Sequence, residues 1–440
     1  METVLVIGAA RSGIAVSKLL LKNGYHVVLT DSNEIKEKAE LQDLGIEVFD
    51  GGHPDCLKDK EYAFIVKNPG IPYRVPFVHY FVEQNAKIYT EIEVAYRFAK
   101  NFNYAAVTGT DGKTTVTTLL YEMLNRQKKS LVAGNIGTPL CELVLEHTDT
   151  DYNVALELSN FQLLGIETFR PHVSTVTNLA PDHLDYMDSL EAYYQSKMRI
   201  YENTNADDYF IRNVDDENVV KYAQNIPCQV IDFSLKRKDV DLYKDDKYAY
   251  YKGTQLFTLS DLKIVGEFNC GNAMMASCMA YLMGVSLFNI QEVIREFSGV
   301  EHRIEYVDTI DNVRFYNDSK ATNTHAACAG LSAFEKNVIL LCGGKDKHIS
   351  FDDLKQYDAV VKKCISFGQT KDKFKDIFTN QISVETMKDA FEKAVLSAKP
   401  GDIVLLCPAC SSFDQFKNYE IRGEIFKQMV HDYASKRNEE

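Results

Sequence analysis

Residues 107–124 read VTGTDGKTTVTTLLYEML, and this stretch decides the fold. A phosphate-binding loop of the Walker A type has the form G-x-x-x-x-G-K-[ST]. Counting back from the Gly-Lys-Thr at 112–114 puts the first glycine of that pattern at Val107, whereas the nearer glycine is Gly109. The loop is therefore two residues shorter than the loop of nucleotide kinases and GTPases, and it indicates another kind of phosphate site.

The sequence around this short loop favours phosphate binding. A strand-like apolar run precedes it and an amphipathic helical pattern follows it, so the loop would open a helix N-terminus. Backbone N–H groups and the helix dipole would hold phosphates, Lys113 would neutralise them, and the Thr114 hydroxyl would reach Mg²⁺. The alternative is a glycine turn that happens to precede a lysine. The predicted phosphate loop consists of Gly109, Thr110, Asp111, Gly112, Lys113, Thr114 and Thr115.

Length and composition set the class of protein. The chain has 440 residues, of which 45% are hydrophobic and 25% charged, and this predicts about three globular domains. The net charge of −14 and the lack of a lysine or arginine run argue against nucleic acid and against anionic membranes. Phosphates on a small ligand stay possible, because a helix N-terminus and a few lysines suffice to bind them.

The cysteines and the apolar runs bear on the compartment. Ten cysteines are scattered without regular spacing, no apolar run approaches the length of a membrane span, and the sequence opens on a strand without a signal-peptide layout. We therefore expect a reduced cytoplasm and no membrane insertion. The lone Cys407-Pro-Ala-Cys410 could be redox-active or bind metal, but we interpret its thiols as ordinary buried or loop cysteines.

Strand-like runs alternate with helical patterns along the whole chain, which predicts an α/β fold with parallel sheets. We expect a Rossmann-like N-terminal domain (1–98), a central P-loop-type ATPase domain with a mainly parallel sheet (99–298) and a Rossmann-like C-terminal domain (299–440). The tyrosine-rich segment 240–258 predicts hairpins. Strands are expected at 3–7, 26–30, 46–49, 64–66, 88–89, 104–107, 153–158, 174–178, 208–212, 313–316, 337–341, 363–367 and 403–406, and a helix at 272–282.

The first strand–helix turn reads GAARSG. A dinucleotide fingerprint is G-x-G-x-x-G, and here Ala10 replaces the middle glycine that lets a backbone approach pyrophosphate, so NAD binding is disfavoured. Arg11 and Ser12 still lie at a helix N-terminus, where anions bind. Asp31 and Ser32, after the second strand, could meet a ribose or a base. The alternative is the ordinary glycine turn of any α/β protein.

The loop G-T-x-G-K-T-T resembles the ATP loop of the Mur ligases and folylpolyglutamate synthases, which are three-domain, ATP-dependent, amide-forming ligases. The resemblance extends over essentially the whole chain, with several motifs in the family's order. It implies ATP and Mg²⁺ as cofactors and an acyl-phosphate intermediate. Its closest branch adds D-glutamate to UDP-N-acetylmuramoyl-L-alanine, a cytoplasmic step of peptidoglycan synthesis, and the protein is expected to act as a monomer.

Three motifs resemble the family's binding site for the UDP-linked substrate. The turn 68–71 (NPGI) resembles the turn beside the uridine nucleotide, although an ordinary Pro-Gly turn is the alternative. The GNIG at 134–137 and the LELSNFQ at 156–162 resemble motifs at the substrate's phosphates and sugar. The residues implied for UDP-substrate binding are Arg11, Ser12, Asp31, Ser32, Asn68, Gly70, Asn135, Ser159 and Gln162.

The metal ligands also rest on the resemblance, apart from one physical argument. Glu157 ends a buried strand, where a carboxylate needs a partner such as a metal; a helix cap or a salt bridge is the alternative. His183, in NLAPDHLD, would help to hold a second Mg²⁺. Lys197 matches a lysine that the family carbamylates into a metal-facing carboxylate, whereas by itself it suggests a solvated helix lysine. The implied metal ligands are Thr114, Glu157, His183 and carbamylated Lys197.

The last third of the chain resembles the part of the family that completes the ATP site. Asn269, in GEFNCGNAMMA, would read adenine, and Arg303 would reach ATP from across the domain junction. In NDSKATN (317–323), Asp318 and Lys320 would contact nucleotide, with Lys320 steadying the transferred phosphate. The catalytic residues that the resemblance implies are Lys113, Glu157, His183, Lys197 and Lys320.

The segment that resembles the family's amino-acid-binding site best distinguishes the branches of the family from one another. The segment 408–420 (PACSSFDQFKNYE) resembles the D-glutamate-adding branch, and the D-N-P-R clamp of the diaminopimelate-adding branch is not found. Residues 411–426 also predict a capped amphipathic helix. Lys347 would pair with the side-chain carboxylate of D-glutamate. The residues implied for D-glutamate binding are Thr322, Lys347, Ser412, Phe413 and Tyr419.

Three positions depart from the family pattern. Asp111 replaces an asparagine and would repel triphosphate unless it is hydrogen-bonded or bridged by metal, Phe268 replaces a histidine at the adenine rim, and Asn160 replaces a serine. Two other functions stay open. One is a ligase of the same architecture that adds L-alanine, a diamino acid, or glutamate to folate; the other is a nucleotide-sensing protein whose catalytic site has decayed.

Overall fold

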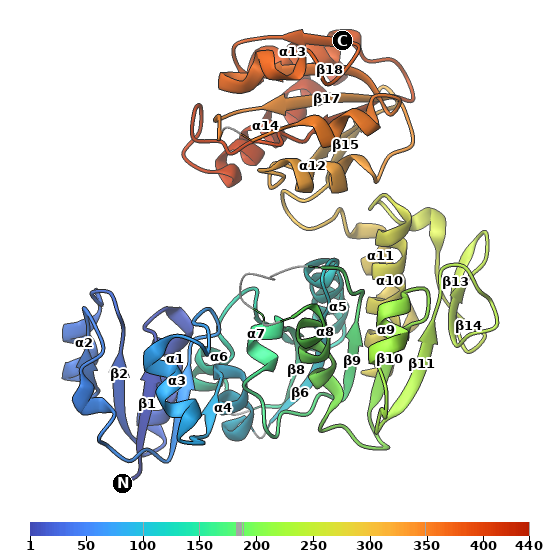
Figure 1. The fold of residues 1–440 in the computed structure, drawn as a ribbon. Coiled ribbons are helices and arrows are strands. Elements are labelled where there is room, and N and C mark those ends of the chain that lie inside the picture. Colours follow the sequence, from blue (N-terminus) through green and yellow to red (C-terminus); the bar gives the residue numbers. More distant parts are fainter. Residues whose placement is uncertain (100, 149, 182–186, 188, 348, 440) are drawn as a thin grey trace. The chain divides into compact units, whose positions relative to one another are not determined.

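The computed structural model describes residues 1–99, 101–148, 150–181, 187, 189–347 and 349–439. The chain forms two compact units, one made of Met1–Leu259 with Gly271–Val293 and the other of Ser260–Cys270 with Ile294–Glu440. Each unit is an α/β structure (Figure 1), with two sheets in the first unit and one in the second among the described residues. The mixed α/β class with mainly parallel sheets is confirmed, whereas the domain boundaries at 98 and 298 stay predictions.

The first sheet is fully parallel, with the order β3-β2-β1-β4-β5. The order reverses between β1 and β4, which makes the carboxyl ends of these two strands the switch point where open α/β sheets bind ligands. Alternate residues of β1 enter different cores, Val4 and Val6 on one face and Leu5 and Ile7 on the other. The elements are β1 (Thr3–Ile7), α1 (Arg11–Lys22), β2 (His26–Thr30), α2 (Lys38–Asp43), β3 (Glu47–Phe49), β4 (Phe64–Lys67), α3 (Pro76–Glu83), β5 (Ile88–Tyr89) and α4 (Glu91–Phe98).

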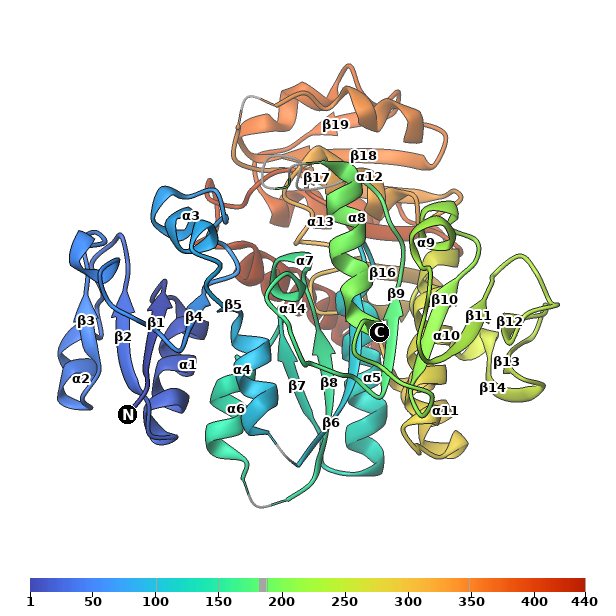
Figure 2. The same cartoon turned by 60° about the horizontal axis from the view of Figure 1, so that its bottom comes forward.

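The second sheet has the order β14-β13-β12-β11-β10-β9-β6-β8-β7, and Figure 2 shows its strands β7 to β11 side by side. Strands β7 to β12 are parallel, and β12, β13 and β14 form the antiparallel hairpins predicted from the tyrosine-rich segment. Its strands are β6 (Phe102–Thr108), β7 (Leu131–Gly134), β8 (Tyr152–Glu157), β9 (Val173–Val176), β10 (Tyr209–Asn213), β11 (Gln229–Phe233), β12 (Leu242–Lys244), β13 (Tyr248–Tyr251) and β14 (Thr254–Thr258).

The helices that follow these strands in the chain bury apolar faces around the same sheet. The helix predicted at 272–282 begins five residues earlier, at Glu267. The helices are α5 (Lys113–Gln127), α6 (Leu140–Glu146), α7 (Asn160–Leu163), α8 (Leu190–Met198), α9 (Glu217–Tyr222), α10 (Glu267–Leu282) and α11 (Leu287–Glu296).

The third sheet has the order β15-β16-β20-β17-β18-β19, and only its edge strand β15 runs antiparallel. Leu340 and Cys342 of β17 enter one core, and Ile339 and Leu341 enter another, so helices cover both faces. The elements are β15 (Glu305–Ile310), β16 (Val313–Asn317), α12 (Thr324–Leu331), β17 (Val338–Gly343), β18 (Val361–Phe367), β19 (Gln381–Ser383), α13 (Met387–Ser397), β20 (Ile403–Leu406) and α14 (Tyr419–Glu439).

The helix predicted over 411–426 is wrong at its start, since α14 begins only at Tyr419. The backbone of Ser411 is bonded elsewhere, because its carbonyl accepts the N–H of Lys345 at 2.9 Å. Asn418 then supplies the cap, its Oδ1 accepting the N–H of Ile421 at 2.8 Å. The preceding residues are therefore left as a turn beside the third sheet.

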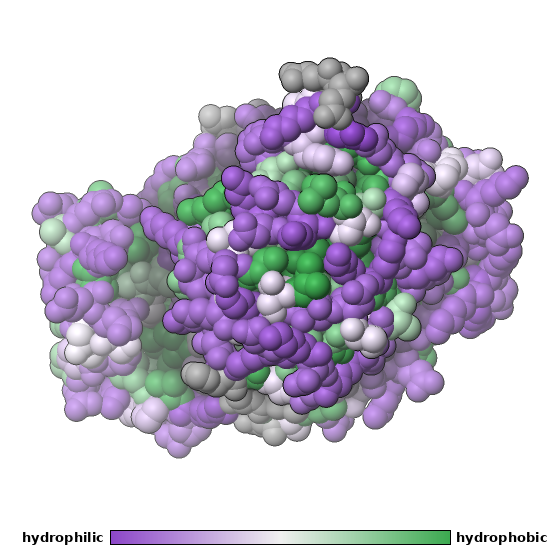
Figure 3. All heavy atoms as spheres, turned by 90° about the horizontal axis from the view of Figure 1, so that it is seen from above, coloured by the Kyte–Doolittle hydropathy of each residue, from purple (hydrophilic) through white to green (hydrophobic). Residues whose placement is uncertain are grey.

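The surface is mostly polar on the face that Figure 3 shows, with hydrophobic residues in smaller groups between hydrophilic ones. Among the described residues, every helix is either too short or too polar to cross a membrane. Both observations agree with the composition and the acidic net charge of the sequence.

A buried carboxylate on α4 organises the loop after α7. Glu93 is fully buried and accepts the backbone N–H groups of Glu167, Thr168 and Phe169 at 2.8, 2.9 and 3.0 Å. Arg97 also donates to it, at 2.8 Å. Although burial alone raises the pKa of Glu93, these hydrogen bonds outweigh it and hold the pKa below its usual range. The ionised carboxylate is therefore part of the folded framework.

We predict that Glu93→Gln lowers the free energy of unfolding at pH 7 by about 3 kcal/mol, because the hydrogen bonds lose their charged acceptor. Since the folded pKa is depressed, the contribution of Glu93 is present above its unfolded pKa and is lost as the pH falls through the folded pKa. Urea unfolding from pH 7 down to pH 3 checks this, with exposed Glu34→Gln as control. Equal destabilisation of the variant at all pH values would contradict the account.

Candidate functional site

The short loop at the start of α5 needs both of its glycines. Gly109 has φ +140°, and a Cβ there would lie 1.9 Å from Thr177 Oγ1. Gly112 has φ +81°, and a Cβ there would lie 2.5 Å from Asn272 Oδ1. The N-cap residue of α5 is Gly112, which has no side chain to cap the first turn. The sequence pattern predicts that this helix N-terminus receives phosphate oxygens, and this stays a prediction.

Two lysines meet at one carbonyl oxygen of this loop. Lys113 Nζ donates to the Gly109 carbonyl at 3.0 Å and to that of Thr110 at 2.7 Å. Lys197 Nζ, from α8, donates to the same Gly109 carbonyl at 2.7 Å. Lys197 is 2% exposed and its ammonium lies 4.7 Å from the centroid of the Tyr193 ring. The interpretation of Lys197 as a solvated lysine is therefore wrong, and the loop carries two converging positive charges.

Residues that follow β9 hold the rest of the loop. Asn178 forms two hydrogen bonds with the backbone of Asp111, both at 3.0 Å, and Thr177 Oγ1 donates to the Asp111 carbonyl at 2.6 Å. Thr110 Oγ1 exchanges hydrogen bonds with the backbone of Ala180, at 3.0 and 3.1 Å. The Asp111 side chain is exposed, which lessens the repulsion of triphosphate expected from it.

Thr177 and Asn272 were missed as functional residues by the sequence reasoning. Each packs against a glycine of the loop, so its importance depends on a contact between segments far apart in the chain. Asn272 stands three residues after Asn269 in the same quoted motif, and this repeated asparagine is the one signal that could have found it.

Glu157 has the environment of a cation ligand. It ends β8, pairs in register with Val107 of β6, and is 1% exposed. Asn135 Nδ2 donates to its Oε1 at 2.8 Å, while its Oε2 is buried without a hydrogen-bond partner. The cap of α7 is Ser159, and the ion pairs between described residues do not include Glu157. A buried, half-satisfied carboxylate fits a hard cation such as Mg²⁺.

Of the other predicted metal ligands, the structure describes Thr114 and Lys197 but not His183. Thr114 lies in the first turn of α5, next to the loop. His183, with Asp182 and Asp185 of its motif, lies outside the described residues, so its role stays a prediction. The surroundings of Glu157 thus fit Mg²⁺, the role of Thr114 stays a prediction, and Lys197 lies beside the same loop.

Six of the residues predicted for the UDP end, Arg11, Ser12, Asp31, Ser32, Asn68 and Gly70, follow strands of the first sheet near its switch point. Asn68 Nδ2 donates to Ser12 Oγ at 3.3 Å, and Asn68 Oδ1 accepts the N–H of Gly70 at 3.0 Å. Asp31 accepts the N–H of Ala9 at 2.7 Å. Burial raises the pKa of Asp31, but its hydrogen bonds with Ala9 and Asn33 together lower the pKa by more, so the net shift is downward. Asp31 is therefore ionised and can accept a ribose hydroxyl, beside the exposed Ser32.

Arg11 links this region to the GNIG turn at 134–137. Its Nη1 lies 3.4 Å from the Gly137 carbonyl, and its guanidinium pairs with Glu142 at 3.3 Å. Ser159 and Gln162 instead bind each other in a capping box at the start of α7. Because the capping box already uses both side chains, the predicted contact of Ser159 and Gln162 with the substrate's sugar stays a prediction.

In the second unit, Arg303 stands between two residues with unusual backbone. His302 has φ +62° and Ile304 has φ +44°, values that strain a side-chain-bearing residue. The Ile304 N–H donates to Asp318 Oδ1 at 3.2 Å, and the His302 carbonyl accepts the N–H of Lys320 at 3.0 Å. Arg303 and Lys320 are both exposed on this braced turn.

Asp318 is buried inside the unit, where its carboxylate shapes the turn that carries Arg303. Burial raises its pKa to about 7, although Cys407 and the backbone of Ile304 partly offset this effect. The predicted direct contact of Asp318 with nucleotide stays a prediction. Cys407 is buried too, and Cys410 lies 3.3 Å from Thr370 Oγ1. All ten cysteines are free thiols.

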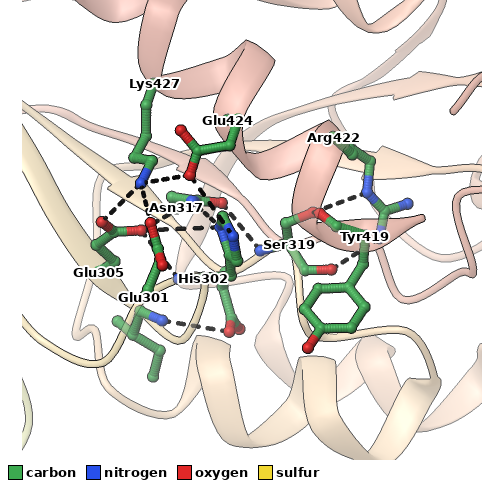
Figure 4. Close-up of polar contacts among 11 residues, drawn as sticks. Glu301, His302, Glu305, Asn317, Ser319, Tyr419, Arg422, Glu424 and Lys427 are labelled. Carbon is green, nitrogen blue, oxygen red and sulfur yellow. Dashed lines mark hydrogen bonds and ion pairs between the residues drawn. The ribbon is translucent and has the colours of Figure 1, made fainter. Parts of the chain in front are cut away.

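An ion-pair cluster fastens the same turn to α14 (Figure 4). Lys427 Nζ lies 2.6 Å from Glu301, 3.3 Å from Glu305 and 2.8 Å from Glu424. Asn317 Nδ2 reaches both Glu305 and the His302 ring, at 2.9 and 3.0 Å. The strain at His302 is thus held by surrounding contacts.

The predicted D-glutamate residues lie around the start of α14. Ser412 is buried, Phe413 is 69% exposed and Tyr419 opens the helix. Arg422, which sequence reasoning missed, is fully buried and donates to the Oγ and the carbonyl of Ser319 at 2.9 and 2.8 Å. It also donates to the Cys410 carbonyl at 3.0 Å, so it ties two predicted binding segments together.

The remaining predicted residues of this unit are placed individually. Lys347 is exposed and follows Lys345, whose N–H bonds to Ser411. Thr322 is half-buried. Asn269 is 7% exposed, and its Nδ2 donates to the Val265 carbonyl at 2.8 Å. Of the departures, Phe268 is 46% exposed and Asn160 is 1% exposed, with its amide 3.5 Å from Met187 Sδ.

We predict opposite effects of Glu157→Gln on stability and on nucleotide binding. Without ligands the melting temperature should rise by a few degrees, because the variant no longer buries an unpaired charge. The apparent affinity for ATP in the presence of Mg²⁺, taken from the rise in melting temperature that ATP causes, should fall at least tenfold. Thermal scans with ATP and Mg²⁺ titrations measure both, with exposed Glu122→Gln on α5 as control. A variant with normal Mg²⁺-dependent stabilisation would exclude Glu157 as a cation ligand.

Comparisons with known proteins show the family of this chain. Residues 107–280 match the Mur ligase middle domain and residues 302–410 match the glutamate ligase domain of Mur ligases. The chain is 43% identical over 440 residues to a UDP-N-acetylmuramoylalanine–D-glutamate ligase of Geobacillus sp. strain WCH70, with 97% of each chain covered. It is 41% identical to the protein of the same name from Bacillus cereus strain G9842, with 98% of this chain and 97% of the relative covered.

Solved structures share the fold at lower identity. A MurF ligase from Thermotoga maritima in complex with ADP has a TM-score of 0.58 at 16% identity, covering 94% of this chain and 96% of its own. A UDP-N-acetylmuramate–alanine ligase from the same organism has a TM-score of 0.56 at 19% identity, covering 98% and 100%. Given its full-length relatives, its two matching domains and its short phosphate loop, the chain belongs to the Mur ligase family of ATP-dependent ligases.

Proposed function

We propose that this chain joins D-glutamate to UDP-N-acetylmuramoyl-L-alanine with hydrolysis of ATP to ADP and phosphate. The full-length similarity to relatives that bear the name of this ligase carries the proposal. The loop geometry supports it, because two lysines converge on Gly109 at the end of β6 while the partly unsatisfied Glu157 ends the adjacent β8. These are the charges that an amide-forming ligase needs around a transferring phosphoryl group.

The reaction runs in two steps. The carboxylate of the substrate's alanine attacks the γ-phosphorus of ATP, the bond to the β-phosphate oxygen breaks, and an acyl phosphate and ADP form. The neutral amine of D-glutamate then attacks the acyl carbon through a tetrahedral intermediate. Phosphate leaves with the electron pair, and the nitrogen loses a proton. Lys113 would offset the charge that develops on the phosphoryl oxygens, and the resemblance to the family assigns Lys320 the role of steadying the transferred phosphate.

The remaining roles follow from the resemblance to the family. Residues 1–98 would receive the UDP-linked substrate, 99–298 ATP, and 299–440 the amino acid through Thr322, Lys347, Ser412, Phe413 and Tyr419. Mg²⁺, held by Thr114 and Glu157 with His183 and a carbamylated Lys197, would neutralise phosphate charge as a Lewis acid. Asn269, Arg303 and Asp318 would complete the ATP site.

We also propose where the protein works. A UDP-linked substrate, ATP and ten unpaired thiols fit a cytoplasmic step of peptidoglycan synthesis. We propose a monomer without nucleic-acid partners, in line with the net charge of −14.

The test is ADP release from ATP and Mg²⁺ with UDP-N-acetylmuramoyl-L-alanine and each of D-glutamate, L-glutamate, L-alanine and lysine. We expect release only when the UDP-substrate and D-glutamate are both present. ADP release with another amino acid would support the ligase reaction but show that the amino-acid substrate is not D-glutamate. Tight ATP binding without release for any pair would favour the non-catalytic, nucleotide-sensing alternative.

Carbamylation of Lys197 makes a separate prediction. Lys197→Ala should lose at least 100-fold in kcat, because the loop loses a charged group that contacts Gly109. If the active form is a carbamate, acetate or bicarbonate should restore part of this activity by supplying a carboxylate to the vacated space. The matched control is Lys113→Ala, which should show no rescue. A folded Lys197→Ala variant that neither salt rescues would contradict the carbamate.

A further inference from the structure

A lysine that the mechanism does not use is buried in the first sheet. Lys67, the last residue of β4, is 0% exposed. Burial lowers the pKa of its ammonium to about 8. A buried ammonium costs free energy unless its protons find acceptors, so its contacts indicate what the charge is for.

Lys67 forms two hydrogen bonds to the turn that follows it in the chain. Its Nζ donates to the carbonyl of Ile71 at 2.7 Å and to that of Asn68 at 3.1 Å. The ammonium also lies 4.5 Å from the centroid of the Tyr73 ring. One cation thus binds both ends of the 68–71 turn from within the domain.

This turn forms one wall of the switch point between β1 and β4. The Asn68 N–H donates to the Ile7 carbonyl at 2.9 Å, and its side-chain amide reaches Ser12 Oγ at 3.3 Å. A Cβ at Gly8 would lie 2.7 Å from Asn68 Cβ, so the first glycine turn and the 68–71 turn are in close contact. A small movement of the 68–71 turn would therefore alter both walls of the place where open α/β sheets bind ligands.

Lys67 is placed to set the position of this turn. Because Lys67 is fully buried whereas Gly70 of the turn is exposed, the exposed side of the turn can receive a nucleotide. Both acceptors are backbone carbonyls, so holding them inward also keeps their negative ends away from an anionic diphosphate.

Building on the proposed function, we propose that Lys67 is a positioning residue for the nucleotide end of the UDP-linked substrate. It acts through the 68–71 turn and does not touch the substrate. Its loss should therefore weaken the binding of UDP and of the UDP-substrate while leaving ATP and D-glutamate unaffected.

The experiment compares the full-length protein with Lys67→Met, which keeps the length of the side chain and removes the cation. We expect the Kd for UDP, from calorimetry, and the KM for the UDP-substrate to rise about tenfold. The KM values for ATP and D-glutamate and the kcat should stay within twofold. Lys58→Met is the matched control, since Lys58 also lies over a tyrosine ring, 5.6 Å from Tyr80, but pairs on the surface with Asp55.

A second pair of variants keeps the test decisive if Lys67→Met does not fold. Tyr73→Leu removes the ring beside the ammonium and should raise the Kd for UDP about threefold, whereas Tyr73→Phe keeps the ring and should bind like the unsubstituted protein. Unchanged UDP binding in Lys67→Met or in Tyr73→Leu, or an equal loss for all three substrates, would overturn the role of Lys67. Lack of UDP binding by the unsubstituted protein would instead contradict the proposed function.

Discussion

The Gly109 carbonyl oxygen is the point on which the site depends, because two lysine ammonium groups bind it at once. Lys113 reaches it from the helix that the loop opens, and Lys197 reaches it from α8. Like charges that share one acceptor repel each other, so an anion nearby would stabilise the arrangement. Glu157, at the end of the neighbouring strand, supplies one negative charge, and a bound triphosphate would supply more. The folded loop is thus prepared for a highly charged ligand.

Several other buried ionisable side chains hold the backbone of predicted binding segments. Their burial costs desolvation free energy. Lys67 holds the turn at the UDP end, Asp318 holds the turn that carries Arg303, and Arg422 joins the segments around Ser319. Replacing a buried ionic contact by apolar packing often leaves a protein as stable or makes it more so. Their presence is therefore better explained by the geometry they impose on exposed neighbours than by stability, and this fits the clustering of perturbed groups at functional sites.

The sequence predicts most of the strands and the glycine turns well, because these depend on local patterns. The positive φ angles of Gly109 and Gly112 follow from the short loop motif, and the hairpins follow from alternating tyrosines. Contacts between distant segments could not be predicted in this way. The burial of Lys197 depends on the packing of α8 against the loop, and the late start of α14 depends on a pairing between Ser411 and Lys345. The helical periodicity of apolar residues cannot reveal that a backbone carbonyl such as that of Ser411 accepts a hydrogen bond from outside the helix.

The two missing residues of the loop explain why its neighbours matter so much. A longer Walker A loop can wrap phosphate with its own backbone, whereas this loop is fixed by Thr177 and Asn178, which follow β9. Both bind the backbone of Asp111 and leave its side chain exposed. An aspartate is thus compatible with the loop where the family has asparagine, because the fold uses that residue's N–H and carbonyl rather than its side chain. The same dependence makes Thr177 and Asn178 as important for the shape of the phosphate site as the glycines that define the motif.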